Sequence, residues 1–568
     1  MADLILLMLI PIIFIGILLV VSSNSLFIML PKENHVLKPI ILLEENNFKM
    51  PLVLQRYYSN IMDIKLNRFP FLKTTSFWHE NTEIRKEEEI IKRKEYEKGL
   101  LRRIGLLLAI TIYFLLFFYW MKFSNIENDF QVLSKIGPID SLLNLDIILA
   151  LDGLSFPFIL LTGFIMPLVF ISNWSTINFL DSYYVMIIIG LELFLIIVFM
   201  VIDLVMFYVF FESILPLLFV LIGIYGAAQK FRAGYYLFLY TLLGSLFMLL
   251  CFVKMGGDAG SSFFDTYTNE DLFPFMQEMI WIILFVSFSV KTPLVPVHIW
   301  LPLAHSDANV SGSIVLASII LKLALYGFLR ILIGIFLLAT ARLTPFFLSM
   351  CTLSLLYSSF TTIRQFDLKV LVAYSSVAHM GSTLLGAFSN QISGLVGSVM
   401  FGLAHGFVSP GLFIGVGAVL YDRCGSRIIN YYRGLSNILP LFTLLFLLLV
   451  FGNMGVPLTA NFVGEFMSLI ASYQQNVFIT TLAALGIILS AIYSIFMYNR
   501  ISTGSISPYI HTIPDLFRKE YIMLFILISA TIFMGIYPTV ISSEIEYGLS
   551  SLLYMNFIPL CWIGKTSL

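Results

Sequence analysis

Ionisable residues recur inside the most apolar stretches of this sequence. A charge near the centre of a bilayer costs several kcal/mol, so each such residue is a functional candidate. Burial also brings the proton affinities of lysine and glutamate closer together. Side chains of this kind on successive helices are suited to relay protons. The main candidates, each deep within its own hydrophobic run, are Glu212, Lys291, Lys322, His379, His405 and Glu465.

Two further residues, Glu192 and His305, are secondary candidates for the same path. Any one of these groups, taken alone, is equally well explained by a hydrogen bond to a neighbouring helix. The joint pattern is harder to explain in that way, because the groups recur on different helices from the fourth to the twelfth. The sequence therefore favours a hydrated line of titratable groups.

The composition requires that these residues lie in a membrane protein. Of 568 residues, 59% are hydrophobic and 12% are charged, against about 25% charged in soluble domains. Mean hydropathy is +0.93. A soluble protein of this length cannot bury so much apolar surface, and a disordered chain or a fibre does not have this composition. The net charge of −1 gives no field that would attract nucleic acid.

The sequence predicts no metal or cofactor site of its own. The four cysteines (Cys251, Cys351, Cys424 and Cys561) are scattered, without the paired spacing of zinc, iron–sulfur or haem motifs. Neither a nucleotide-binding P-loop nor a dinucleotide fingerprint is present. Redox chemistry or ATP hydrolysis would therefore need other subunits.

Hydrophobic runs long enough to cross a bilayer predict an all-α polytopic membrane protein with about fourteen transmembrane helices. The runs are 2–30, 104–121, 152–172, 183–201, 203–225, 234–253, 278–300, 309–334, 345–363, 369–389, 394–421, 438–468, 478–498 and 521–541. We interpret the first as a permanent helix, because it lacks the basic start of a signal peptide.

Three of the expected helices contain helix-breaking residues. Pro293 and Pro296 follow Lys291 in helix 7, and a Gly-Pro stretch at 452–457 precedes Glu465 in helix 12. Helix 11 is expected to be interrupted similarly over 406–411. Non-helical backbone at membrane depth is tolerated where it is buried in protein or lines a water-filled cavity. Broken helices 7 and 12, five helices apart, predict two inverted five-helix repeats, helices 4–8 and 9–13.

The remaining charges indicate organisation and orientation. More than a third of them lie in residues 32–103, which we interpret as an aqueous connection, with a docking surface for a neighbouring subunit as the alternative. Basic residues concentrate in connections that leave odd-numbered helices, so that side should face the matrix or cytoplasm. The few Lys and Arg assigned to the other side are Lys122, Lys135, Lys254, Arg330 and Arg342.

These features divide the chain into six segments. The expected segments are a first helix (1–30), a charged extramembrane insert (31–103), helices 2 and 3 (104–182), two antiporter-like repeats (183–334 and 345–498) and a last helix with a tail (499–568).

Four stretches of the chain resemble the NADH dehydrogenase subunit 4 family of antiporter-like subunits of respiratory complex I. They read DLVMFYVFFESILP, VKTPLVPVHIWLPLAHSDANVSGSIVLASIILKLALYG, IRQFDLKVLVAYSSVAHMG and GNMGVPLTANFVGEFMSL. Their order and spacing match the family over about residues 145–540. The glutamate in NFVGEF favours subunit 4, since subunits 2 and 5 usually carry lysine there. One departure is Asn309, where the family often has proline.

The resemblance implies a role for each matched residue. Glu212 would pair with Lys291 on broken helix 7, Lys322 would connect the two halves, and Glu465 would be the terminal residue on broken helix 12. His379 and His405 would be the polar residues of the second half. Such a subunit moves protons, coupled to electron transfer from NADH to ubiquinone. This chain would therefore belong to an enzyme while holding no redox centre.

The resemblance also implies surroundings for the chain. NADH, FMN, iron–sulfur clusters and ubiquinone would be held elsewhere in the complex. Neighbours would include the subunit 2-like and subunit 5-like membrane subunits, with membrane lipids, for which cardiolipin is a candidate. The location would be the mitochondrial inner membrane. The composition, rich in Phe and poor in Lys and Arg, separately suggests an organelle gene. Two alternatives stay open, namely a subunit of a multisubunit cation/proton antiporter and a non-transporting scaffold.

Overall fold

The computed structural model describes residues 99–123, 130–139, 145–174, 176–177, 180–268, 273–510 and 513–550. The expected first helix, most of the charged insert and the end of the tail lie outside the described residues. The number of fourteen helices therefore stays a prediction, as do the boundaries of the six segments.

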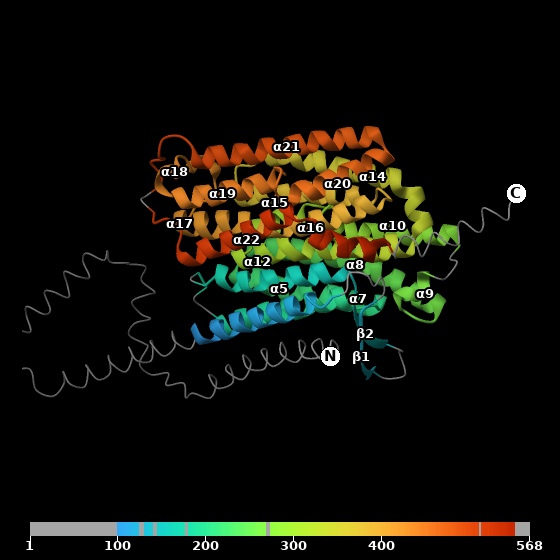
Figure 1. Cartoon of the computed structure of the whole chain (residues 1–568). Coiled ribbons are helices and arrows are strands. Elements are labelled where there is room, and N and C mark those ends of the chain that lie inside the picture. The colour runs from blue at the N-terminus through green and yellow to red at the C-terminus, as the bar shows by residue number, and fades with distance from the viewer. Residues whose placement is uncertain are drawn as a thin grey trace, which may run out of the picture.

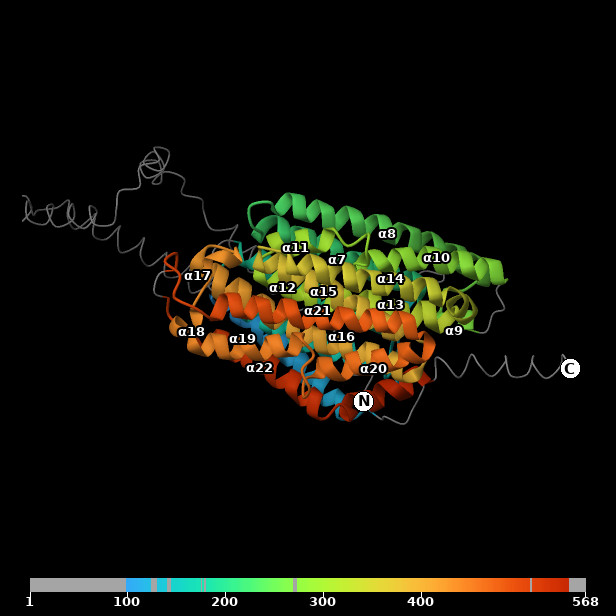
Figure 2. The same ribbon diagram turned by 90° about the horizontal axis from the view of Figure 1, so that it is seen from above.

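Long helices lying side by side form the described part of the chain (Figures 1 and 2). Twelve of them are long and apolar enough to cross a membrane, and a thirteenth, α19, is shorter. All thirteen correspond to hydrophobic runs expected from residue 104 onward. They are Gly99–Trp120, α5 (Ser155–Ser172), α6 (Asp181–Met200), α7 (Leu204–Tyr225), α8 (Lys230–Ala259), α10 (Pro274–Lys291), Val310–Ile333, α14 (Leu337–Ile363), α15 (Leu368–Ala387), Ile392–Cys424, α19 (Pro440–Asn453), α21 (Val477–Ser502) and α22 (Arg518–Ile536).

The two expected broken helices are both confirmed. Helix 7 consists of α10 and the short α11 (Trp300–Asp307), and helix 12 consists of α19 and α20 (Ala460–Gln475). Both first halves begin at a proline, Pro274 and Pro440. Proline is favoured there because the first amide of a helix has no intrahelical partner in any case.

Two helices at the centre contain π-helical turns. Val310–Ile333 comprises α12 (Val310–Val315), η2 (Leu316–Ile320), α13 (Leu321–Gly327) and η3 (Phe328–Ile333), and Ile392–Cys424 comprises α16 (Ile392–Phe413), η4 (Ile414–Tyr421) and α17 (Asp422–Cys424). The most apolar stretch of each is completely buried. By contrast, α8 and α21 expose apolar side chains such as Leu250 and Leu485, as expected for helices that face lipid. The π-helical turns η2, η3 and η4 of the two central helices are of a type that is frequent at functional sites.

A capped corner marks the start of α7. The Asp203 carboxylate accepts hydrogen bonds from the amides of Val205 and Met206. Asp203 also forms an isolated β-bridge with Phe263, which follows the C-terminus of α8. This corner lies beside α9 (Phe264–Thr268), at the end of the bundle that also carries the β-strands (Figure 1).

The same corner recurs at the opposite end of the bundle. Asp367 caps α15 by accepting from the amides of Lys369 and Val370, and it bridges to Ile428, which follows α17. This second corner lies at the end that carries α17 and α18 (Leu435–Ile438) (Figure 1). Equivalent helices thus start from opposite ends, which supports the predicted inverted repeats.

Charge distinguishes these two ends. We call the end with α17 and α18 the basic end, because Arg102, Arg423 and Arg427 form buried or half-buried contacts there. We call the other the hairpin end. It carries an antiparallel pair that the sequence analysis missed, β1 (Val132–Ile139) and β2 (Leu145–Leu151). The hydrophobicity of β2 runs into that of α5, so the apolar pattern did not separate the strand from the helix.

Two sequence-based expectations are wrong. Helix 11 is not interrupted over 406–411, since α16 continues through Pro410 and the irregular π-turns begin only at Ile414. Arg330 is not a loop residue, since it lies inside η3 and is 7% exposed. Its guanidinium forms an ion pair with Asp152, at the start of α5. Asp152 is 178 residues away in the sequence, and its carboxylate compensates the buried charge of Arg330 near the end of this helix.

Candidate proton path

Four ionisable side chains form a connected row through the centre of the bundle. Lys322 comes from α13, His405 from α16, His379 from α15 and Glu465 from α20. Each is at most 5% exposed. The structure thus brings together four of the six main residues singled out in the sequence.

The row begins with a lysine and a histidine in direct contact. Lys322 Nζ lies 2.8 Å from His405 Nδ1 and donates to the carbonyl oxygen of Ala317 at 2.6 Å. Ala317 lies in the π-turn η2, so the altered helix geometry supplies the carbonyl that anchors the lysine. An ammonium hydrogen pointing at the imidazole lone pair is the arrangement required for proton transfer between the two groups.

The row continues from His405 to His379, whose ring centres are 5.6 Å apart. His379 Nε2 lies 3.1 Å from Asn453 Oδ1, and Nδ1 lies 3.5 Å from Glu465 Oε1. An amide oxygen only accepts, so Nε2 carries a hydrogen. Nδ1 is then the nitrogen that faces the Glu465 carboxylate and can exchange a proton with it.

The break in helix 12 brings Glu465 back toward the path. Gly455 lies in this break with a left-handed φ of +68°, and a Cβ there would lie 2.4 Å from Glu465 Oε2. Glycine is therefore needed at this position both for the backbone conformation and for the approach of the carboxylate.

Replacement of Gly455 by alanine should displace Glu465 from His379. We expect Gly455→Ala to lower proton translocation by the intact complex several-fold, whereas Gly257→Ala should have no effect. Gly257 lies on α8, and a Cβ there would meet no atom within 4 Å. The measurement is acidification around membrane vesicles per NADH oxidised. Equal proton yields from the two variants would show that the approach of Glu465 to the break is unimportant.

Glu212 and Lys291 lie in a separate group, on α7 and at the end of α10. Lys291 Nζ donates to the Phe211 carbonyl oxygen at 3.0 Å and lies 3.1 Å from the centre of the Phe211 ring. Glu212 is the next residue along α7, and its charge acts on Lys291. Within the described structure the two charges do not form the direct ion pair that the resemblance implied.

The break in helix 7 is stabilised by a tryptophan. Trp300 Nε1 donates to the carbonyl oxygen of Val290 at 2.7 Å, and Trp300 is 1% exposed. Because Pro293 cannot donate a backbone hydrogen bond, a carbonyl near the end of α10 needs another partner. After the break, Asn309 caps α12 by accepting from the amide of Gly312. The departure from the family sequence at Asn309 therefore supplies a helix cap.

The two secondary candidates are buried without hydrogen-bond partners. Glu192 on α6 and His305 on α11 are each 0% exposed. Both carboxylate oxygens of Glu192 and both ring nitrogens of His305 lack a hydrogen-bond partner among the described residues. Buried polar atoms of this kind are rare in folded proteins and are often functional. The structure therefore keeps both residues as candidates.

Several residues of the path were missed in the sequence. Asn453 contacts His379, and Asn461 lies one turn before Glu465 with its amide buried and unpartnered in the described structure. Lys369 is a third, with 2% of its surface exposed. Asn453 and Asn461 lie on either side of the Gly-Pro break, and polar residues beside a helix break could have been recognised in the sequence as candidates for the path. Lys369 follows Asp367 at a helix start, where a lysine ordinarily reaches solvent.

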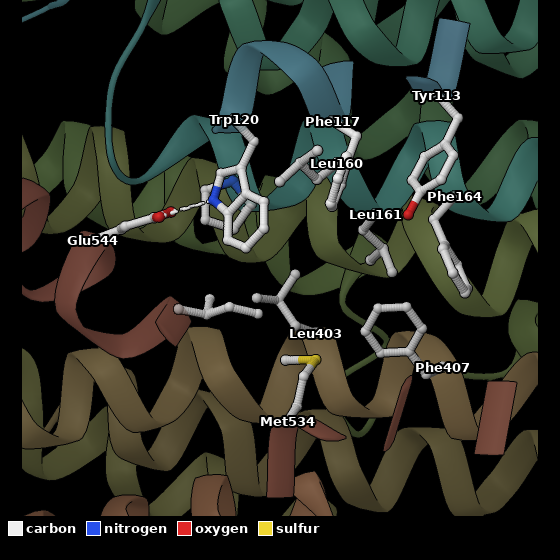
Figure 3. A pocket seen from close by; sticks show the side chains of 12 residues that line it. Tyr113, Phe117, Trp120, Leu160, Leu161, Phe164, Leu403, Phe407, Met534 and Glu544 are labelled. Atoms are coloured by element: carbon white, nitrogen blue, oxygen red, sulfur yellow. Dashed lines mark hydrogen bonds between the residues drawn. The ribbon is translucent and has the colours of Figure 1, made fainter. Parts of the chain in front are cut away.

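A cavity of about 130 Å³ lies between Gly99–Trp120, α5, α16 and α22 (Figure 3). Its lining is apolar except at one edge, where Glu544 accepts a hydrogen bond from Trp120 Nε1 at 2.8 Å. Burial raises the pKa of Glu544 to about 7, and the bond from Trp120 opposes this shift. Residues 539–550 are helical and follow α22. None of the six main candidate residues lines this cavity.

The described residues contain no group of three or more His, Cys, Asp or Glu side chains that could hold a metal ion.

Comparisons with known proteins identify the family. Residues 201–493 match the family model described as "NADH:quinone oxidoreductase/Mrp antiporter, TM". NADH-ubiquinone oxidoreductase chain 4 of Mycosarcoma maydis is 42% identical over 455 residues, covering 80% of this chain and 93% of that protein. The chain 4 protein of Arabidopsis thaliana is 40% identical over 457 residues, with 80% and 92% covered. The chain belongs to the NADH-ubiquinone oxidoreductase chain 4 family.

Solved structures agree with membership in the chain 4 family. A chain of respiratory complex I from Thermus thermophilus with bound NADH superimposes with a TM-score of 0.72 at 26% identity, covering 80% of this chain and 95% of that one. A chain of the Mrp complex from Dietzia sp. gives a TM-score of 0.73 at 16% identity, with 82% and 95% covered. That second likeness shows the shared fold alone. The chain is thus an antiporter-like, multi-pass membrane subunit.

Proposed function

We propose that this chain translocates protons as a membrane subunit of NADH:ubiquinone reductase, respiratory complex I. Electron transfer from NADH to ubiquinone would take place in other subunits, which hold FMN and iron–sulfur clusters. The observation that carries the proposal is the connected row of Lys322, His405, His379 and Glu465, all buried at membrane depth.

The contacts support a stepwise transfer along the row. The Lys322 ammonium gives a proton to His405 Nδ1 across 2.8 Å, and the imidazolium releases its other proton from Nε2. The ring of His379 lies next, with its centre 5.6 Å from that of His405, and a water molecule would carry the proton across this gap because His405 Nε2 has no hydrogen-bond partner in the described structure. His379 then exchanges a proton with Glu465, 3.5 Å from Nδ1. Each step moves one proton between a donor and a base, so charge is conserved at every stage.

Glu212 and Lys291 would control this transfer by electrostatics. An opposite charge nearby favours the charged form of both partners. A change in the distance between Glu212 and Lys291 therefore changes how firmly Lys291 holds its proton, and the Phe211 ring lies beside the Lys291 ammonium. Coupling to electron transfer would act on this distance.

The same proposal places the chain in the mitochondrial inner membrane beside the subunit 2-like and subunit 5-like antiporter subunits, with cardiolipin among its lipids. The names of the relatives and the likeness to a complex I chain support it. Purification in mild detergent should recover this chain together with flavin- and iron–sulfur-bearing subunits. Recovery with a sodium-exchange complex instead would favour the antiporter alternative.

The direct test replaces Lys322 by methionine, which keeps the chain length and removes the charge. We expect Lys322→Met to lower proton translocation and coupled turnover about a hundredfold, the lower end of the range for loss of a positioned acid or base. The control is Lys254→Met, because Lys254 lies on α8 with 55% of its side chain exposed. Protons counted per NADH oxidised in vesicles give the readout, and NADH oxidation with a soluble acceptor reports intact redox subunits. An unchanged proton yield in Lys322→Met would favour the scaffold alternative.

A further inference from the structure

A second buried lysine lies at the basic end, outside the connected row. Lys369 is in the first turn of α15, yet only 2% of its surface is exposed. Its Nζ donates to the carbonyl oxygen of Ala308 at 2.7 Å, just after α11. The side chain therefore crosses from the second repeat to the broken helix of the first repeat.

The surrounding helices leave room for this lysine. A Cβ at Gly417, in the π-turn η4, would lie 3.5 Å from Lys369 Cε and 3.0 Å from a methyl group of Val310. Lys369 therefore occupies a space between η4 and α12 that a larger residue at position 417 would fill. A buried lysine accommodated in this way between membrane helices indicates a specific role.

Acidic groups connect Lys369 with the surface of the basic end. Its charge is influenced by four charged groups, Arg427, Asp422, Asp367 and Asp307. Asp367 is occupied as the cap of α15, and Asp307 lies 3.9 Å from Arg427. Asp422 is the exposed member of the set. A proton from water can therefore reach the neighbourhood of Lys369 through a carboxylate that remains in contact with solvent.

His305 lies near both Lys369 and the connected row. The charges of both Lys369 and Lys322 act on its ring, which is completely buried and stacked on Phe413 with ring centres 4.5 Å apart. Both ring nitrogens lack hydrogen-bond partners in the described structure. An imidazole with two free nitrogens can accept a proton on one side and release one on the other.

We propose that Lys369 is the proton-loading residue of the basic end, receiving protons from the surface and passing them through His305 to Lys322. The step is a plain proton transfer. The Lys369 ammonium loses a proton and one nitrogen of His305 gains one, the other nitrogen loses a proton and neutral Lys322 gains one, and Lys369 is reprotonated from water through Asp422. Water would bridge the two transfers at His305, because neither ring nitrogen is in hydrogen-bond contact with a lysine. This inference rests on the proposed function, because it supplies the protons that the connected row conducts.

Two substitutions separate proton loading from a structural role. Lys369→Met removes both the charge and the proton, whereas Lys369→Arg keeps a permanent positive charge and a donor for Ala308 but cannot release a proton. We expect both variants to assemble, and both to slow proton uptake from the basic side at least about tenfold. A structural anchor predicts the opposite for arginine, which would restore uptake to the wild-type rate. Restoration by arginine would therefore overturn the proposal.

A second measurement decides the matter if the arginine variant does not assemble. Lys369 and His305 are two steps of one route, so the effects of replacing them are not independent. The double variant Lys369→Met, His305→Gln should therefore take up protons no more slowly than the slower of the two single variants. Losses that multiply in the double variant would overturn the proposal. The control Lys230→Met changes a lysine of the same end that lies at the start of α8 and donates to the Ile224 carbonyl oxygen, and it should leave uptake unchanged.

Comparison with Lys322→Met distinguishes proton loading by Lys369 from proton translocation by the connected row. A loss of translocation in Lys322→Met together with normal uptake in Lys369→Met would refute proton loading by Lys369 and leave the proposed function standing. Normal translocation in both variants would refute the proposed function itself.

Discussion

Lys291→Met should lower coupled turnover and proton translocation of the complex about a hundredfold, the lower end of the range for loss of a positioned proton-transfer group. Lys291 is 2% exposed, donates to Phe211 and ends α10 at the break in helix 7. Its replacement removes the charge on which Glu212 acts. Glu212→Gln should have the same effect by removing the other charge. The measurement is proton translocation per NADH oxidised, at equal amounts of assembled complex.

A matched control exists for the carboxylate on the neighbouring helix. Glu278 lies on α10 and pairs with Arg342, whose side chain is 62% exposed. Exposed pairs of this kind contribute about 0–1 kcal/mol, so Glu278→Gln should assemble and translocate protons like the unmodified complex. Normal proton translocation in both Lys291→Met and Glu212→Gln would refute a role for this group.

Arg330→Met should destabilise the chain by about 3–5 kcal/mol, because it leaves the Asp152 carboxylate buried without its partner. The side chains of both residues are 7% exposed. Asp152 also accepts from the Ser155 amide at the start of α5. We expect a marked fall in the amount of assembled complex and in its thermal stability, measured by native electrophoresis after heating.

The double variant tests whether charge is the cause. Arg330→Met with Asp152→Asn removes both charges, and the asparagine oxygen can still accept from Ser155. This combination should recover much of the lost stability, whereas Arg342→Met, at the exposed pair, should change stability by at most about 1 kcal/mol. A double variant as unstable as Arg330→Met would show that the loss arises from packing.

The sequence was sufficient to predict the helices and the buried charges, because both are local properties. Hydrophobic runs predict membrane helices wherever backbone groups must satisfy one another, and the breaks follow from Pro293 and from the Gly-Pro stretch at 452–457. The interruption predicted for helix 11 was wrong because Pro410 is accommodated within α16. Neighbouring helices can re-satisfy the backbone groups that a proline frees.

The contacts within the path could not be predicted, because they join residues distant in sequence. His379 meets Asn453 74 positions away, and Lys322 meets His405 83 positions away. Which pairs meet depends on helix packing and on π-turns such as η2, which leave no periodic signal. The resemblance supplied a pairing of Glu212 with Lys291; in the structure each charge acts on the other, while the hydrogen bond of Lys291 goes to the Phe211 carbonyl oxygen.

The two capped corners have a consequence for direction. Asp203 and Asp367 cap their helices in the same way at opposite ends of the bundle. The backbone at these two corners therefore does not distinguish one face of the membrane from the other. A vectorial process needs a difference between the faces, and that difference must come from side chains. Two residues beyond the cap, one corner carries Val205 and the other Lys369. Under the proposed function, the direction of transport would therefore be set by positions, such as 205 and 369, at which the two halves carry different side chains.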